Sequence, residues 1–353
     1  MSTRSAKRHL HVVLFIASVS AGAQAQVPAE SFDLRHWKLT LPVDDDGDGK
    51  VDEIDVRALQ DYAHPDFFFL DDNGFLVFSA PNRGVTTANS TNARSELRQM
   101  FRSTNTDIGT HSPKNNFALA AHPRAGRFAD IGGQDEATLR VLHVPGNAKY
   151  PDRPPAFSVV VGQIHAIRNE ALNRRGFGWG NEPLKIAYKK WPGHETGSVY
   201  WAYERNLAAN DPDRTDIIYP VWGNGWDDPT DPGANGIALG ELWNYNVNVY
   251  RNRMFLTFRT TDPSNTVRFE IDLSDDVDAY GKIDDKDNPN GYSGDALYFK
   301  AGAYNQCSTR DEPSFRYPAC AGTGDWAVDE ANGDYASVAF QRILLTRASA
   351  PDR

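Results

Sequence analysis

The chain has 353 residues, of which 40% are hydrophobic and 24% are charged, and its formal net charge is −10 at pH 7. This composition is typical of a globular protein with a sizeable core. The negative balance argues against nucleic acid as a partner, because phosphate binding requires a basic field; a basic surface for an acidic ligand must therefore be local.

The first residues have the pattern of a secretory signal peptide. Three Lys and Arg residues precede the apolar run VVLFIASVSAGA, and a small-residue motif, Ala-Gln-Ala, ends it. The run is shorter than the ~20 apolar residues that a membrane span needs, and no later run reaches that length. We therefore expect residues 1–25 to be removed after Ala25. Residues 26–353 are expected to form one domain that is secreted or periplasmic.

Residues 44–55, DDDGDGKVDEID, resemble a calcium-binding loop of the EF-hand type, with alternating carboxylates and a glycine for the sharp turn. The loop positions that would surround an ion are Asp44, Asp46, Asp48, Lys50, Asp52 and Asp55. The final aspartate stands where the pattern has glutamate, and the preceding segment WKLTLPV is typical of a strand instead of a helix. A structural calcium site and a solvated acidic turn both remain open.

Short runs of Val, Ile, Tyr, Phe and Trp, bounded by Gly, Pro, Asn or Asp, predict β-strands along most of the chain. The predicted strands are residues 74–81, 137–144, 157–167, 184–190, 197–204, 243–250, 253–260, 267–274, 296–306 and 337–346. A tight polar turn in VYRNRMFLTF predicts a hairpin, and residues 55–62 predict a short helix. Many strands without a repeat or linker predict an all-β fold, a two-sheet sandwich or jelly roll whose concave face suits an extended polymer.

Three segments place large polar side chains on one face of a strand. Side chains in a strand alternate between its two faces. The shared faces carry Arg94, Glu96 and Arg98 in one segment, Gln163 and His165 in the second, and Tyr298, Lys300, Gly302, Tyr304 and Gln306 in the third. Val160 and Ile164 are expected on the face opposite Gln163. One such strand would fit a solvated face. Guanidinium, amide, imidazole and phenol groups distributed over three such strands instead indicate a site.

RSELR at 94–98, QIH at 163–165 and YFKAGAYNQ at 298–306 resemble the three signature segments of the alginate lyases of polysaccharide lyase family 7. The similarity extends over most of residues 31–348. The resemblance implies a β-jelly roll with these segments in a concave groove. It implies cleavage of the 4-O-glycosidic bond of alginate, an anionic polysaccharide, by β-elimination, which leaves an unsaturated uronate. It also implies catalysis without a metal or other cofactor.

The resemblance assigns the catalytic roles to Arg94, Gln163, His165 and Tyr304. The first two would neutralise the uronate carboxylate while charge develops beside it. Tyr304 would protonate the leaving oxygen and, on mannuronate, also remove the C5 proton; on guluronate His165 would be the base. The implied substrate-binding residues are Glu96, Arg98, Tyr298, Lys300 and Asn305.

The middle residue of Gln-x-His is Ile164, and isoleucine at this place in the family accompanies guluronate-containing substrates. Poly-G or mixed blocks are therefore the expected substrate. Cys307 and Cys320 are the only cysteines, and an exported chain favours a disulfide between them. We expect a monomer that binds alginate and neither nucleic acid nor membranes.

Two other functions remain open on the sequence. FEIDLSDD resembles the strand motif of laminarinase-type jelly-roll hydrolases, with Glu270 and Asp272 as its carboxyl pair and Asp275 in place of the final glutamate. A non-catalytic carbohydrate-binding protein would explain the eight Trp and fourteen Tyr residues, but not the combination of Arg, Gln, His and Tyr on three strands.

Overall fold

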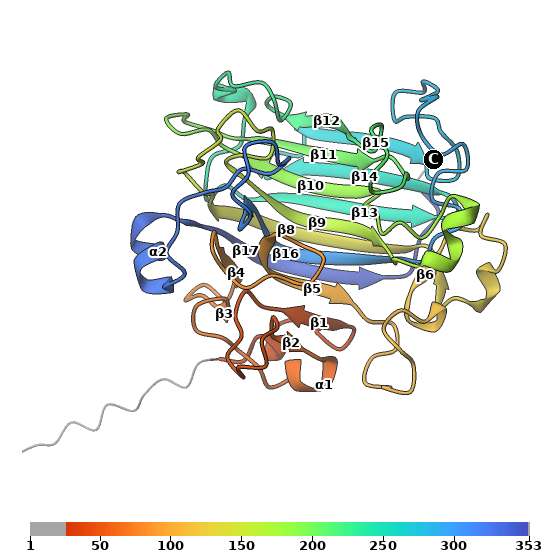
Figure 1. The fold of residues 1–353 in the computed structure, drawn as a ribbon, viewed down its shortest axis with the longest axis horizontal. Coiled ribbons are helices and arrows are strands. Elements are labelled where there is room, and N and C mark those ends of the chain that lie inside the picture. The colour runs from red at the N-terminus through yellow and green to blue at the C-terminus, as the bar shows by residue number, and fades with distance from the viewer. Residues whose placement is uncertain (1–25, 352–353) are drawn as a thin grey trace, which may run out of the picture.

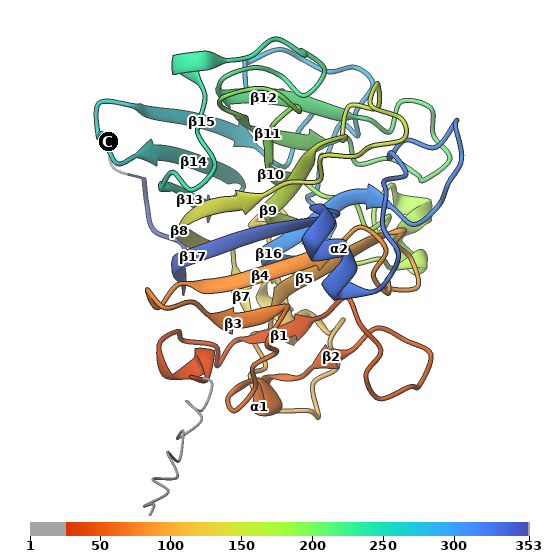
Figure 2. The same cartoon turned by 90° about the vertical axis from the view of Figure 1, so that its left-hand side faces the viewer.

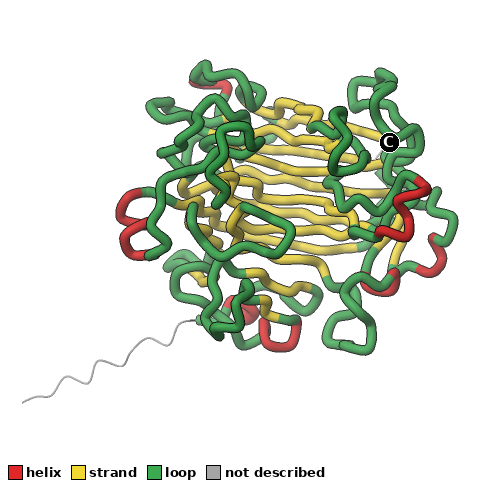
Figure 3. Tube along the Cα trace, viewed as in Figure 1, coloured by secondary structure: helices red, strands yellow, loops and turns green. Residues whose placement is uncertain are grey.

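The structure, a computed structural model, describes residues 26–351, so the predicted signal peptide lies outside the described residues. Two β-sheets lie face to face, and Figure 2 shows them as two layers. The helices are short and lie at the periphery, and loops gather at both ends of the strands (Figure 3). No helix of residues 26–351 is long and apolar enough to cross a membrane.

The strands and helices in chain order are as follows (Figure 1). The strands are β1 (Trp37–Thr40), β2 (Glu53–Ile54), β3 (Phe68–Leu70), β4 (Leu76–Pro81), β5 (Asn92–Gln99), β6 (Phe117–Ala118), β7 (Asp130–Ile131), β8 (Gly133–His143), β9 (Ser158–Ala166), β10 (Leu184–Lys189), β11 (Ser198–Glu204), β12 (Asp216–Trp222), β13 (Trp243–Tyr250), β14 (Arg253–Thr260), β15 (Thr266–Asp272), β16 (Leu297–Ser308) and β17 (Tyr335–Thr346). The helices are α1 (Val56–Leu59) and α2 (Trp326–Asn332), with 3-10 turns η1 (Pro28–Glu30), η2 (Pro113–Asn115), η3 (Ala125–Arg127), η4 (Glu170–Arg175) and η5 (Gly233–Asn235).

The larger sheet runs β12-β11-β10-β9-β16-β5-β1-β2, and β6 and β7 extend it beside β16. The smaller sheet runs β15-β14-β13-β8-β17-β4-β3. Neighbouring strands are antiparallel except for β6 and β7, which are parallel. Strands far apart in sequence, such as β5, β9 and β16, are therefore neighbours. The predicted all-β jelly roll is confirmed, as is the hairpin of β13 and β14.

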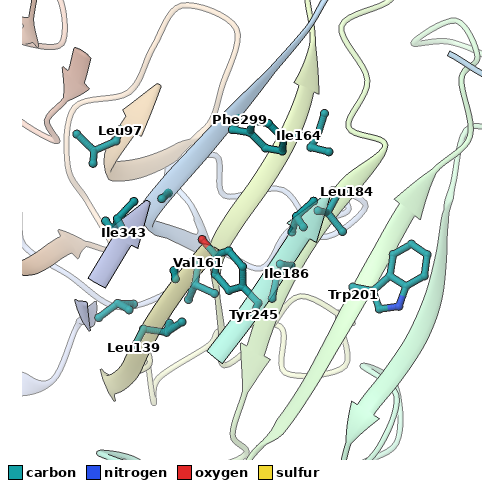
Figure 4. Close-up of a cluster of buried hydrophobic side chains, with 14 of the residues drawn as sticks. Leu97, Leu139, Val161, Ile164, Leu184, Ile186, Trp201, Tyr245, Phe299 and Ile343 are labelled. Carbon is teal, nitrogen blue, oxygen red and sulfur yellow. The ribbon is translucent and has the colours of Figure 1, made fainter. Parts of the chain in front are cut away.

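The core fills the space between the two sheets (Figure 4). Leu97, Ile164 and Phe299 of the larger sheet pack there against residues of the smaller sheet such as Leu139 and Tyr245. All five are at most 1% exposed. Burial of one such side chain stabilises the fold by about 1.5–3 kcal/mol. Each strand of the larger sheet thus has one face fixed to the core, and this leaves its other face for a site.

Val160 does not follow the predicted alternation. The pairing of β9 with β10 shifts between Gly162 and Val160, so that Val161 is an extra residue in β9. A bulge of this kind changes which side chains share a face beyond it. Val160 consequently forms a small apolar cluster with Tyr304, on the face away from the core. Ile164, before the bulge, lies in the core as predicted.

All ten predicted strands and the short helix are present, but β2, β3, β6, β7, β12 and α2 were not predicted. β12 contains Pro220, which lacks a backbone N–H and usually argues against a strand. The strand tolerates it because it lies at the edge of the larger sheet. The predicted disulfide is confirmed: Cys307 is bonded to Cys320, with the two Cα atoms 5.5 Å apart.

Candidate active site

The three polar segments lie on the adjacent strands β5, β16 and β9 of the larger sheet. Register brings their side chains together in rows. Lys300 of β16 lies between Arg98 of β5 and Gln163 of β9, and Tyr298 lies beside His165. The outward face of these strands, away from the core, is called the site face below.

Glu96 is the centre of the charges on the site face. Its side chain is buried and forms ion pairs with Arg94, at 3.2 Å between Nη1 and Oε2, and with the Lys300 ammonium. Its other oxygen accepts a hydrogen bond from the Gln163 amide. Burial alone would raise the pKa of Glu96, but the positive charges of Lys300 and Arg94 together lower it. The carboxylate therefore stays ionised and holds three substrate-facing groups in place.

The charge of Lys300 is less stabilised than the charge of its ion-pair partner Glu96. Burial disfavours its charge, and the nearby guanidinium of Arg94 disfavours it further, so that the pKa of Lys300 falls to about 8 in spite of Glu96. Glu96 has three donors to offset its burial, whereas Lys300 has one carboxylate. The ammonium charge is therefore lost more readily than that of an exposed lysine.

Arg94 and Tyr304 form the second group of the site. The guanidinium carbon lies 4.0 Å from the centre of the Tyr304 ring, and Arg94 Nη2 donates to Ser90 Oγ at 2.9 Å. Ser90 Oγ is in turn 3.3 Å from Tyr304 Oη. Arg94 Nε is buried without a hydrogen-bond partner among the described residues. Buried donors are seldom left unpaired, so this N–H is available to an acceptor that enters the site.

Arg98 and Tyr298 close one side of the site face. The Arg98 guanidinium stacks on the Tyr298 ring at 4.0 Å, and it donates to Asn116 Oδ1 at 2.7 Å and to the carbonyl of Thr110 at 3.1 Å. Its donors are thus largely used by the protein. Burial raises the pKa of Tyr298 to about 12, so this phenol stays neutral. The pair forms a fixed wall beside His165, whose ring stacks on Tyr298.

Both ring nitrogens of His165 lie near protein acceptors. Nδ1 is 2.7 Å from the carbonyl of Ala166, and Nε2 is 3.1 Å from Oε1 of Glu182. A second carboxylate therefore orients the imidazole, in the way that metal-bound and catalytic histidines are often oriented. Neither Glu182 nor Ser90 was predicted. Both come from loops outside the three segments, and no sequence spacing connects them to the site.

Beyond Tyr304 the site face continues over β10, β11 and β12. A small cavity there is lined by aromatic and charged side chains, among them Tyr200, Trp226, Tyr317, Lys185 and Asp216. Lys185 Nζ and Asp216 Oδ1 form an ion pair at 2.7 Å. The disulfide closes the loop that carries Tyr317, and so it limits the movement of this wall.

Comparison with known proteins agrees with this geometry. The family model for alginate lyase matches residues 32–347. An alginate lyase of Klebsiella pneumoniae is 36% identical over 306 residues, which cover 84% of this chain and 90% of that protein. The chain belongs to the alginate lyase family.

Two solved structures of alginate lyases are similar in fold and sequence. The crystal structure of the alginate lyase from Klebsiella pneumoniae superposes with a TM-score of 0.70 at 31% identity, over 92% of this chain and 99% of that one. The exolytic PL7 alginate lyase of Zobellia galactanivorans gives the same values. The chain is thus a polysaccharide lyase of family 7, and lyases of this family act without a cofactor.

Within this lyase, Asn305 does not reach the site face, and its prediction as a substrate-binding residue is wrong. Its side chain is fully buried, and its amide donates to Asn82 Oδ1 and to the carbonyl of Ala80, both at 2.9 Å. Alternation along β16 explains the difference, because Asn305 follows Tyr304 directly and so points to the opposite face.

The acidic loop of the lyase forms only part of the predicted calcium cage. Ligand atoms of Asp44, Asp46 and Asp48 lie within 4.8 Å of one another and could approach a cation together. Asp55, predicted as the last ligand, instead binds Arg102 through both oxygens at 3.0 Å. Asp52 and Lys50 are also engaged, by the backbone of Asp45 and by the Asp48 carboxylate. The twelve-residue EF-hand arrangement is therefore not formed.

The hydrolase alternative also fails. Glu270 and Asp272 lie on β15, the edge strand of the smaller sheet, where both pair with Arg253. They are therefore in the other sheet from the site face. The family membership excludes a laminarinase-type hydrolase and a non-catalytic binding protein as the class of this chain.

Proposed function

We propose that this lyase cleaves guluronate-containing alginate, with Arg94, Gln163, His165 and Tyr304 as its catalytic residues. The observation that carries the proposal is the convergence of three distant segments around Glu96, where Arg94 Nε is buried without a hydrogen-bond partner among the described residues. The lyase class rests on the family; the residue roles rest on this geometry.

In the proposed reaction the substrate carboxylate binds beside Arg94 and Gln163. Arg94 Nε supplies a hydrogen bond that the protein leaves unused. Gln163 is held by Glu96 through its NH₂ group, and its Oε1 has no protein partner among the described residues. That oxygen can accept a hydrogen bond from a carboxyl group that has taken up a proton. Donors already in place stabilise charge that develops only in the transition state.

Proton transfer is assigned to Tyr304 and His165. The electron pair of the C5–H bond forms the C4=C5 double bond as the base removes the C5 proton. The C4–O4 electron pair stays on the departing O4, which the phenol protonates. Arg94 and Lys300, at 4.0 and 5.9 Å from the ring centre, place positive charge where the phenol oxygen becomes negative. On guluronate the C5 proton and O4 lie on opposite sides of the sugar, so that His165 is the base there; its Nε2 takes the proton and gives up its contact with Oε1 of Glu182.

The wider setting is also a proposal. We infer that residues 26–353 act as one exported domain, in the periplasm or outside the cell, and as a monomer. The isoleucine of Gln-Ile-His supports the preference for poly-G or mixed blocks. Its side chain lies in the core, so its effect on the substrate must pass through the position of β9.

Rates on poly-G, poly-M and mixed blocks test this function, with the ultraviolet absorbance of the unsaturated product as the readout. We expect residues 26–353 to release that product, and Tyr304→Phe to lower kcat by about 10²-fold or more. Tyr280→Phe is the matched control, because Tyr280 is 61% exposed and lies outside the site. Full activity of Tyr304→Phe would contradict the site assignment, and no product from the wild-type protein would contradict the function.

A further inference from the structure

A second cavity is lined by residues just after β9 and just before β16. β6 pairs with the first residue of β16 at this end of the larger sheet, which lies away from α2 in Figure 1. The volume of the cavity is about 260 Å³. Ile167, two residues after His165, and Ala296, two residues before Tyr298, line it, and they are joined by a backbone hydrogen bond of 2.8 Å. Two residues of extended chain span roughly 7 Å, so the cavity adjoins the reactive groups.

The cavity is positively charged although the protein as a whole is acidic. Arg124, Arg127, His111 and His122 line it, and no Asp or Glu is among its described lining residues. Neither guanidinium makes an ion pair or a hydrogen bond within residues 26–351. Burial lowers the pKa of His122, and the positive charges of Arg124 and Arg175 lower it further. The two arginines are therefore the cations that face this space, and no carboxylate lines it among the described residues.

The same cavity has an apolar wall. Phe128, Leu172, Ile167 and Ala296 supply carbon surface, and Asn169 adds an amide. Arg127 belongs to η3 and Leu172 to η4, and both turns are among the red segments at that end of the strands in Figure 3. A protein that binds a uronate needs a cation for the carboxylate and an apolar surface for the pyranose ring. An inorganic anion would use only the first.

We propose that this cavity, named here the arginine pocket, is a secondary uronate-binding site that takes a sugar of the alginate chain beyond the two units joined by the bond that is cleaved. Arg124 and Arg127 bind its carboxylate, and Phe128 and Leu172 contact its ring. The inference rests on the proposed function, because the polymer on the site face is what delivers the sugar. It also explains how an acidic protein holds a polyanion beyond the reacting unit.

The kinetic test removes both arginines, in Arg124→Ala/Arg127→Ala, and compares oligoguluronates of increasing defined length. We expect kcat/KM on long chains to fall about ten-fold, mainly through KM, because charge-assisted hydrogen bonds to the carboxylate are lost. The shortest oligomer that is cleaved should react at the wild-type rate. Arg259→Ala/Arg268→Ala is the matched control, because it removes the same charge from exposed positions of the smaller sheet. Equal losses at every length, or none at any length, would overturn the proposal.

A binding test keeps the pocket separate from turnover. Calorimetry with long and short oligoguluronates compares Tyr304→Phe with the same variant that also lacks both arginines. We expect the dissociation constant of the long oligomer to rise about ten-fold and that of the short one to stay unchanged. The same affinity of both proteins for the long oligomer would contradict the proposal that the arginine pocket binds a uronate. A wild-type protein that releases no unsaturated product would contradict the proposed function, and this binding comparison would still decide the pocket.

Discussion

At the scale of single residues, the site depends on one buried carboxylate. Glu96 is 2% exposed, yet it is surrounded by Arg94, Lys300 and Gln163, so its charge is fully partnered. Removal of one partner from a buried ion pair costs about 3–5 kcal/mol, because the other charge is left uncompensated. Replacement of Glu96 should therefore destabilise the folded protein as well as lower activity.

Lys300 makes the site sensitive to alkaline pH. Because burial lowers its pKa to about 8, the ammonium is present below that pH and is lost above it. We expect kcat/KM on alginate to fall as the pH rises through about 8, since a cation beside the substrate carboxylate disappears. Lys300→Arg keeps its charge and should move this falling limb to higher pH. An unchanged limb in Lys300→Arg would show that another group is responsible.

We expect His165 to matter more for the cleavage of poly-G than for the cleavage of poly-M. His165→Asn removes the base and keeps a polar side chain, so that kcat on poly-G should fall about 10²-fold or more. The loss on poly-M should be smaller, because Tyr304 can serve there as both base and acid. Initial rates on the two homopolymers measure the ratio. Equal losses on both substrates would indicate that the imidazole orients the substrate instead of removing its proton.

At the scale of elements, the contact between β16 and β5 sets the geometry of the site. Gly302 has φ +147°, and a Cβ at this position would lie 2.5 Å from the carbonyl oxygen of Ser95. We therefore expect Gly302→Ala to push β16 away from β5 and to lower the free energy of unfolding by about 1–3 kcal/mol. Activity should fall with it, since Tyr304 and Arg94 face each other across this pair.

Urea unfolding and alginate cleavage measure the two effects of Gly302→Ala. Gly109→Ala is the matched control, because a Cβ there meets no atom within 4 Å and its φ is not positive. The control should unfold and react as the wild type does. Wild-type stability of Gly302→Ala would contradict the account of this strand pair.

The strands were predictable because each buries one face, so that apolar and polar residues alternate along its sequence. Alternation also predicts which side chains of β5 and β16 reach the site face, and it would have excluded Asn305. It fails at Val160, because a bulge depends on the partner strand and leaves no sign in β9 itself. Glu182 and Ser90 reach the site through loops, whose paths follow from tertiary packing instead of local pattern.

At the scale of the whole molecule, the smaller sheet contributes a buried acid. Asp135 of β8 is 1% exposed, and its Oδ2 accepts a hydrogen bond from the Tyr245 hydroxyl at 3.3 Å while Oδ1 has no partner among the described residues. Burial raises its pKa to about 8. In the unfolded chain the value returns to about 3.9. The folded state thus keeps a proton that the unfolded state releases between these two values.

This difference makes stability fall with rising pH. Between about pH 4 and pH 8 the folded state binds more protons at Asp135, so the free energy of unfolding should decrease by up to about 1.4 kcal/mol per pH unit from this group. Below about pH 4 Asp135 is protonated in both states, so the free energy of unfolding no longer changes with pH through this group. Asp135→Asn removes the titration and keeps the shape, so its stability should decrease less steeply over that range. Urea unfolding of both proteins at pH 5, 6, 7 and 8 measures the two slopes, and parallel slopes would show that Asp135 is ionised in the folded protein.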